Sequence, residues 1–244
     1  MKQIKLYFKK TRLTPTELAV KLQGFLMEKV PSAYAEFLHT QETNPYSLWV
    51  LNQAAVQLWV VNLLTDEACE MIQQVLMNLE VINLDSYSDL IVIEKMEVSH
   101  LSNQQLLELF STECDQQTFS IHFLTPTSFK TAGEYAIFPT TRLLFQSLMQ
   151  KYSRLFPDFN TFDEELLDYI SEHSKITSYR LQTSYFTIHQ KKIPAFLGRV
   201  TIKIKGASTL KAYIKMLLTF GEFSGVGIKT SMGMGGLEIE KRKT

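Results

Sequence analysis

The chain carries the same order of extended and helical patterns twice: strand, helix, strand, strand, helix, strand. Apolar residues that alternate with polar ones indicate half-buried strands, and apolar residues at spacings of three and four indicate helices with one buried face. In the first half these patterns lie, in order, at residues 4–9, 18–26, 46–51, 55–64, 66–79 and 90–93. This order is typical of the split βαβ plan of ferredoxin-like domains.

The second half repeats the order after a connecting segment over residues 101–115. Its first strand begins at Thr118, and we expect it to stop at Pro126 because proline cannot donate to a strand ladder. The remaining patterns lie at residues 139–155, in a long hairpin that returns over 198–206, and at 208–217 and 236–239. The sequence therefore predicts an α+β fold of two tandem ferredoxin-like (βαββαβ, RRM-like) domains with a C-terminal glycine-rich loop. We place the domains at residues 1–112 and 113–244.

Charge is balanced over the whole chain but not along it. The 25 Lys and Arg residues equal the 25 Asp and Glu residues, which excludes both a strongly basic protein and an acidic solvating tail. Residues 171–244 nevertheless carry 13 basic and 4 acidic side chains, which leaves 12 basic and 21 acidic ones in residues 1–170. The C-terminal part is therefore the expected side for an anionic partner.

Two cysteines and a charged N-terminus place further limits on the class of protein. Cys69 and Cys114 form no paired motif, so the sequence predicts neither a disulfide framework nor a cysteine metal site. The opening MKQIKLYFKK lacks the apolar core of a signal peptide, and no window approaches the roughly 20 apolar residues of a membrane span. We expect a cytoplasmic protein without membrane contact, metal or cofactor.

The run GEFSGVGIKTSMGMGG, residues 221–236, holds 6 of the 10 glycines of the chain. Glycines allow successive backbone N–H groups to point the same way and a ligand to approach the main chain, so such a loop can bind phosphate. The run fits neither a P-loop nor a dinucleotide fingerprint, because the spacing of lysine and glycines differs and a strand follows instead of a helix. The alternative is a structural turn into the last strand.

The run GEFSGVGIKTSMGMGGLEI resembles the C-terminal glycine-rich signature of the RAMP superfamily of CRISPR-associated proteins, in particular its repeat-cleaving endoribonucleases, the Cas-six family. Weaker similarities lie in family order at residues 22–27, 37–48, 125–129 and 193–200. The resemblance implies two ferredoxin-like domains and a metal-independent nuclease that cuts CRISPR precursor RNA within each repeat. In that reaction the ribose 2′-hydroxyl attacks the phosphate and leaves a 2′,3′-cyclic phosphate and a 5′-hydroxyl.

His39 is the catalytic residue that the resemblance implies, because it lies where the family carries its histidine and can exchange a proton near neutral pH. The family tyrosine and lysine are absent: Met27 occupies the tyrosine position, and no lysine lies between His39 and Tyr46. Either Tyr46 or Ser47 assists His39, or the missing charge comes from Lys29 or from a distant basic residue such as Lys229.

Binding of RNA is expected on the basic C-terminal half, because neutralised phosphates release counterions. The candidate residues are Lys191, Lys192, Arg199, Lys203, Lys205, Gly225, Gly227, Lys229, Ser231, Gly233 and Gly235. The expected partner is the repeat of CRISPR precursor RNA, with an effector ribonucleoprotein complex and a homodimer as further partners. Two alternatives stay open: a non-catalytic RNA-binding RAMP subunit of an interference complex, and a protein-interaction scaffold whose glycines only form a turn.

Overall fold

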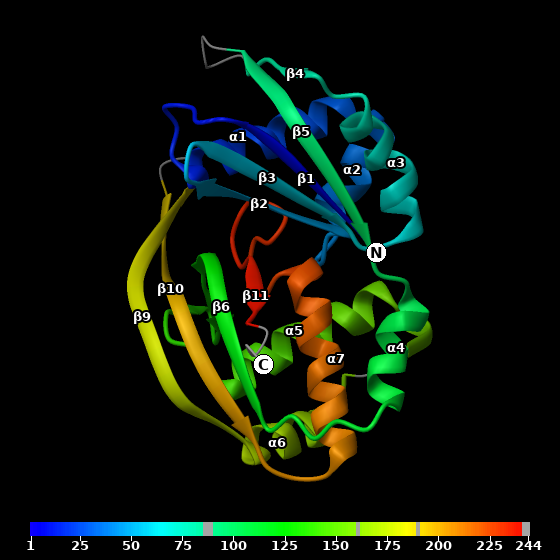
Figure 1. Cartoon of the computed structure of the whole chain (residues 1–244), viewed down its shortest axis with the longest axis vertical. Helices are drawn as coiled ribbons and strands as arrows, with labels where there is room; N and C mark the ends of the chain where they lie inside the picture. The colour runs from blue at the N-terminus through cyan, green and yellow to red at the C-terminus, as the bar shows by residue number, and fades with distance from the viewer. Residues whose placement is uncertain (85–89, 160–161, 189–190, 241–244) are drawn as a thin grey trace.

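The computed structural model describes residues 1–84, 90–159, 162–188 and 191–240. It contains a small two-stranded sheet and two larger antiparallel sheets, and helices cover each of the larger two (Figure 1). In each of the two larger sheets, the first strand of the βαββαβ unit lies between the third and the fourth strand of that unit, which is the ferredoxin-like arrangement. The predicted fold class is confirmed. Among the described residues, no helix is long and apolar enough to cross a membrane.

The first sheet has the strand order β2-β3-β1-β5-β4. Ile4, Leu6 and Phe8 point to one face of β1, where they pack with Leu18 and Leu22 of α1 in a buried core. The last strand is longer than the predicted 90–93, because it pairs with β1 from Lys2 to Phe8 despite its many charged residues. The elements are β1 (Lys2–Lys9), α1 (Pro15–Lys29), α2 (Ser32–Thr40), β2 (Tyr46–Gln53), β3 (Val56–Leu63), α3 (Asp66–Met77), β4 (Val81–Ile82) and β5 (Ile91–His100).

The second sheet has the order β11-β6-β10-β9. Val200, Ile202 and Ile204 of β10 are buried against the helices α5 and α7, which cover that face of the sheet. The elements are α4 (Asn103–Ser111), β6 (Thr118–Thr127), β7 (Phe129–Thr131), β8 (Glu134–Ala136), α5 (Thr141–Leu155), η1 (Pro157–Phe159), α6 (Glu164–His173), β9 (Ser174–Ile188), β10 (Lys191–Ile204), α7 (Ser208–Ser224) and β11 (Leu237–Ile239).

The prediction that the first strand of this half stops at Pro126 was wrong, since β6 continues to Thr127. The register between β10 and β6 shifts between Phe196 and Gly198, so the ladder does not require an N–H group from the proline. The carbonyl of Pro126 instead accepts a hydrogen bond from the N–H of Gly235, at 3.1 Å.

The helix α4 connects the two halves but packs with the second. Its buried Leu106 belongs to the core formed by α5, α7 and β10, and Phe110 makes an edge contact with Tyr213 of α7. The boundary between residues 112 and 113 stays a prediction, and this packing favours a boundary before α4.

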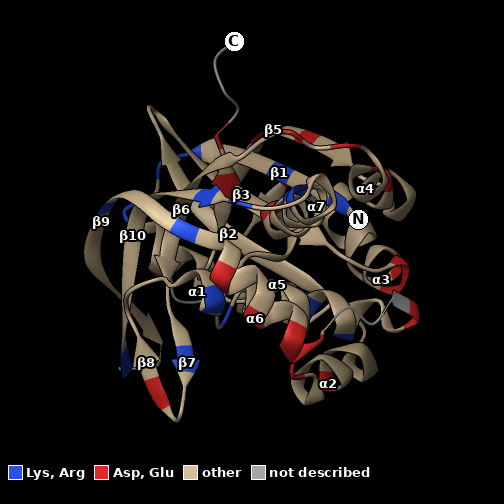
Figure 2. Ribbon diagram, turned by 90° about the horizontal axis from the view of Figure 1, so that it is seen from below, with Lys and Arg blue, Asp and Glu red and all other residues tan. Residues whose placement is uncertain are grey.

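A few elements carry charged side chains of one sign. The helices α3 and α6 carry Asp and Glu but no Lys or Arg, whereas β9 and β10 carry Lys and Arg but no Asp or Glu (Figure 2). Other elements carry both signs, such as β5 with Glu94, Lys95 and Glu97.

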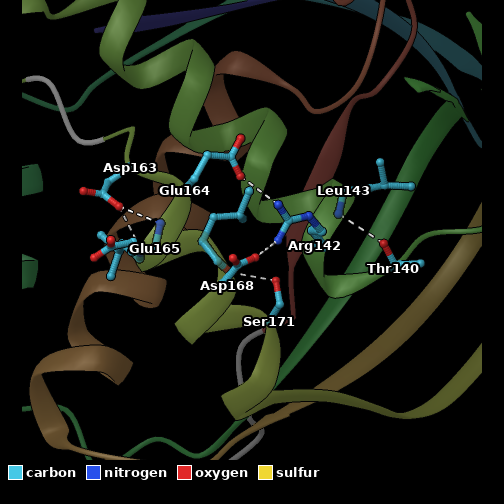
Figure 3. Close-up of polar contacts among 10 residues, drawn as sticks. Thr140, Arg142, Leu143, Asp163, Glu164, Glu165, Asp168 and Ser171 are labelled. Atoms are coloured by element: carbon cyan, nitrogen blue, oxygen red, sulfur yellow. Dashed lines mark hydrogen bonds and ion pairs between the residues drawn. The ribbon is translucent and has the colours of Figure 1, made fainter. Parts of the chain in front are cut away.

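Arg142 at the start of α5 holds α6 in place through two carboxylates (Figure 3). It donates to Glu164 at 2.7 Å and also to Asp168, and its side chain is 42% exposed. Exposed ion pairs of this kind contribute little in salt. We expect Arg142→Ala to lower the free energy of unfolding only slightly in urea denaturation, and by less at high salt. A large loss that persists at high salt would show that the docking of α6 depends on this residue.

Candidate active site

His39 lies in the last turn of α2 and is exposed. The helix is anchored by the buried side chains of Tyr34 and Leu38, so the residue that follows Leu38 is turned toward solvent. The helix ends immediately afterwards, where the Thr40 hydroxyl donates to the carbonyl of Phe37 at 2.7 Å. The histidine is therefore accessible at the end of a helix, before the loop that enters β2.

The loop after His39 is fastened to the second half of the chain. Arg154 of α5 pairs with Glu42 at 2.8 Å and donates to the Thr43 hydroxyl at 3.3 Å. Farther along, the side chain of Asn44 donates to the Ser231 hydroxyl at 3.2 Å. These contacts bring the segment beside His39 to the glycine-rich loop.

A cleft of about 640 Å³ lies where these segments meet. Its walls are residues 42–44, the β7–β8 hairpin, one side of α5 and residues 227–232 of the glycine-rich loop. Among the described residues that line it, the basic side chains are Lys130, Lys151, Arg154 and Lys229, against the single acid Glu42. This excess of positive charge makes the cleft suitable for a phosphate backbone.

A second cavity, of about 920 Å³, lies between the two sheets. Its lining includes Lys5 and His122 but also the carboxylates of Glu222 and Glu238, together with apolar side chains such as Leu197. The balance of charge there does not favour a polyanion. The cleft beside the His39 segment is the better candidate.

Most glycines of the loop are required by close packing. A Cβ on Gly227 would lie 2.3 Å from the Ser128 carbonyl oxygen, and one on Gly235 would lie 2.0 Å from that of Val226. Gly233 faces Ala19 of α1, at 2.6 Å from such a Cβ. The segment after α7, red in Figure 1, passes below the first sheet before it enters β11. A structural role in close packing therefore accounts for the positions of these glycines.

Few N–H groups of the loop remain available for a ligand. The N–H of Gly227 donates to the Ser147 hydroxyl at 2.8 Å, and that of Ile228 donates to the Ser128 carbonyl at 3.0 Å. Within the described part of the chain, the N–H groups of residues 229–231 have no hydrogen-bond partner, and all three residues line the cleft. Lys229 also has a positive φ of 54°. Any phosphate contact of the loop in this cleft is thus expected at Lys229–Ser231. The N–H groups of Gly225, Gly227 and Gly235 are bonded inside the protein, and Gly233 lies outside the residues that line this cleft.

Tyr46 and Ser47 are both buried at the start of β2. Burial raises the pKa of the Tyr46 hydroxyl, which lies 3.9 Å from the Met27 sulfur. The Ser47 hydroxyl donates to the carbonyl of Phe223 and accepts a hydrogen bond from Asn62 at 2.9 Å. We do not retain either hydroxyl as a group that contacts RNA, because both are used inside the fold.

The predicted basic track on β10 lies away from the cleft. Arg199 and Lys203 alternate with the buried Val200 and Ile202, so they point to the face of the sheet opposite α5. Arg199 also pairs with Glu240 at 2.6 Å. The remaining lysines of the track, all exposed, are Lys191 and Lys192 at one end of β10 and Lys205 just beyond its other end. Of the predicted binding residues, the structure brings Gly227, Lys229 and Ser231 to the cleft.

Sequence reasoning missed Lys151, whose ammonium is enclosed beneath the glycine-rich loop. The signal was present in the sequence, because Lys151 follows Leu144 and Leu148 on the apolar face of α5. A lysine in an apolar stripe is unusual, since charged side chains are almost never fully buried without a partner. In the described part of the chain, no group of three or more His, Cys, Asp or Glu side chains could hold a metal ion.

Comparison with known proteins agrees with this arrangement. The model of the CRISPR-associated endoribonuclease Cas6 family matches residues 121–237. Cas6 from Streptococcus thermophilus is 51% identical over 243 residues, which is 100% of both chains. The chain belongs to the Cas6 family. Cas6 from Mycobacterium tuberculosis is 34% identical over 228 residues, covering 91% of this chain and 72% of that protein.

Solved Cas6 structures share the fold at lower identity. A Cas6 product complex matches with a TM-score of 0.78 and 21% identity, over 99% of this chain and 100% of that chain. Cas6 from Thermus thermophilus matches with a TM-score of 0.72 and 23% identity, over 98% of both chains. The tandem arrangement of two ferredoxin-like units is therefore shared with Cas6 along essentially the whole chain.

Proposed function

We propose that this Cas6 protein is an endoribonuclease that cleaves CRISPR precursor RNA within each repeat to give guide RNAs. The observation that carries the proposal is the position of the loop after His39, which forms one wall of a positively charged cleft. The glycine-rich loop and α5 form the other walls. His39 is exposed three residues before this wall, and we propose that RNA bound in the cleft extends to its imidazole.

In the proposed reaction the ribose 2′-oxygen attacks the adjacent phosphorus, and the bond from phosphorus to the 5′-oxygen breaks. A base takes the proton of the 2′-hydroxyl, and an acid gives a proton to the leaving 5′-oxygen, so the products are a 2′,3′-cyclic phosphate and a 5′-hydroxyl. His39 performs one of these proton transfers, since an imidazole can accept or donate a proton near neutral pH. The reaction requires no metal ion.

Names of the similar solved proteins agree with RNA as the ligand. Two of them are a Cas6 product complex and a Cas6 substrate mimic complex, and a third is a RAMP protein binding different RNA substrates. An effector ribonucleoprotein complex, a homodimer and a cytoplasmic location stay predictions for this chain.

The test is incubation of the purified protein with a labelled repeat RNA in excess EDTA. We expect cleavage at one position, a 2′,3′-cyclic phosphate on the upstream product, and no cleavage of an RNA with a 2′-deoxy nucleotide at the cut. Cleavage that needs an added divalent ion would contradict the metal-independent mechanism. Tight binding without cleavage would instead favour the non-catalytic RAMP subunit, an alternative suggested by the missing family lysine.

A further inference from the structure

Lys151 places a positive charge under the glycine-rich loop. Its ammonium donates to the Gly225 carbonyl at 3.1 Å, to the Thr230 hydroxyl at 3.0 Å and to the Ser224 carbonyl at 3.4 Å. All three acceptors are neutral. The residue as a whole is half-buried on α5 and lines the cleft.

The charged groups around the cleft do not neutralise this ammonium. On the same helix, Arg154 already pairs with Glu42, the acid of the cleft lining. The glycine-rich loop adds Lys229 and the β7–β8 hairpin adds Lys130, both of which are positive. Within the described residues Lys151 has no ion pair, and burial lowers the pKa of its ammonium to about 7. An enclosed cation without a counter-charge is unfavourable until an anion arrives.

Hydrogen-bond donors for such an anion lie next to the ammonium. Thr230, which accepts from Lys151, belongs to the segment 229–231 whose backbone N–H groups have no partner within the described part of the chain. Backbone N–H groups of a turn together with a lysine are a common arrangement for holding phosphate oxygens.

We propose that the N–H groups of Lys229, Thr230 and Ser231 bind one phosphodiester group of the RNA substrate, and that the ammonium of Lys151, held behind this turn, supplies the positive charge that favours the anion. This subsite rests on the proposed function, because it lies in the same cleft and assigns to Lys151 the cation that the family lysine would supply. Bound phosphate favours the protonated ammonium, so RNA binding takes up a proton whenever the free protein carries a neutral Lys151. Affinity therefore falls as the pH rises through about 7.

The test measures binding of a repeat RNA with a 2′-deoxy nucleotide at the cut, which cannot react, by fluorescence anisotropy between about pH 6 and pH 9. We expect Lys151→Met to weaken binding about tenfold or more near pH 6 and to remove most of the pH dependence above 7. Lys151→Arg keeps its charge throughout and should also show a flat profile. Lys9→Met, which removes a side chain that is 88% exposed on β1, is the matched control and should follow the wild type.

If the RNA affinity of Lys151→Met depends on pH as that of the wild type does, the proposal is overturned. If neither variant folds, the test is calorimetry of repeat RNA binding to the His39→Ala protein near pH 8, in buffers of different ionisation enthalpy. We expect binding to take up a fraction of a proton. Binding without proton uptake would contradict the subsite. The binding assay is independent of cleavage. If the protein shows this pH-dependent binding but does not cut RNA, the phosphate subsite is supported and the proposed function is contradicted.

Discussion

His39→Ala is expected to lower the single-turnover rate of repeat cleavage by about 100-fold or more, because it removes a positioned proton-transfer group. RNA affinity should change little, since the imidazole lies at the end of α2 and the basic side chains of the cleft remain. The measurement is single-turnover cleavage with enzyme in excess, together with a binding assay on the 2′-deoxy RNA.

His100→Ala provides the matched control, because His100 is also exposed but lies at the end of β5, whereas His39 lies three residues before Glu42, the first residue of the cleft wall. Its cleavage rate should stay close to that of the wild type. Equal rates for the wild type and both variants would remove His39 from the mechanism.

Gly235→Ala is expected to destabilise the protein by about 3 kcal/mol or more. The new methyl group would lie 2.0 Å from the Val226 carbonyl oxygen, and the residue has a φ of +72°, where side chains other than glycine are strained. Relief requires movement of the loop, which would also break the hydrogen bonds of Gly235 with Pro126 and Val226. Urea denaturation measures the loss, and weaker RNA binding should accompany it.

Gly24→Ala is the matched control for this substitution. Gly24 lies within α1, and a Cβ there meets nothing within 4 Å. Alanine favours the helix by about 0.5–1 kcal/mol, so the variant should be slightly more stable than the wild type. A similar loss in both variants would show that the close approach at Gly235 is not the cause.

The fold was predictable because its strands and helices carry simple apolar periods. Ile4, Leu6 and Phe8 alternate on β1, and Val200, Ile202 and Ile204 alternate on β10. The extent of β5 was not predictable in this way, because its residues Glu94 to His100 are largely polar and their extended form depends on pairing with β1. The end of β6 near Pro126 was also not predictable, because it depends on a register shift in the pairing with β10, which the sequence of β6 does not show.

The site was predictable only where a motif carried it. The resemblance to the family pointed to His39, and the loop that follows it, residues 42–44, lines a cleft that reaches Lys229 and Ser231. Periodicity could not show that the hydroxyl of Ser47 is consumed by contacts with the second half of the chain. Nor could it show that α5 and the loop after His39 form walls of one cleft, because that depends on how the two halves pack.

The contacts of the glycine-rich loop also set when the protein becomes competent during its synthesis. Gly233 packs against Ala19 of α1 and Gly236 against Trp49 of β2, and the N–H of Leu48 donates to the carbonyl of Thr230 at 2.9 Å. These contacts join residues far apart in the sequence, and such contacts form late in folding. The segment that carries His39 therefore leaves the ribosome well before the wall opposite it exists. A nascent chain therefore cannot bind RNA in this cleft before Gly236 has been synthesised.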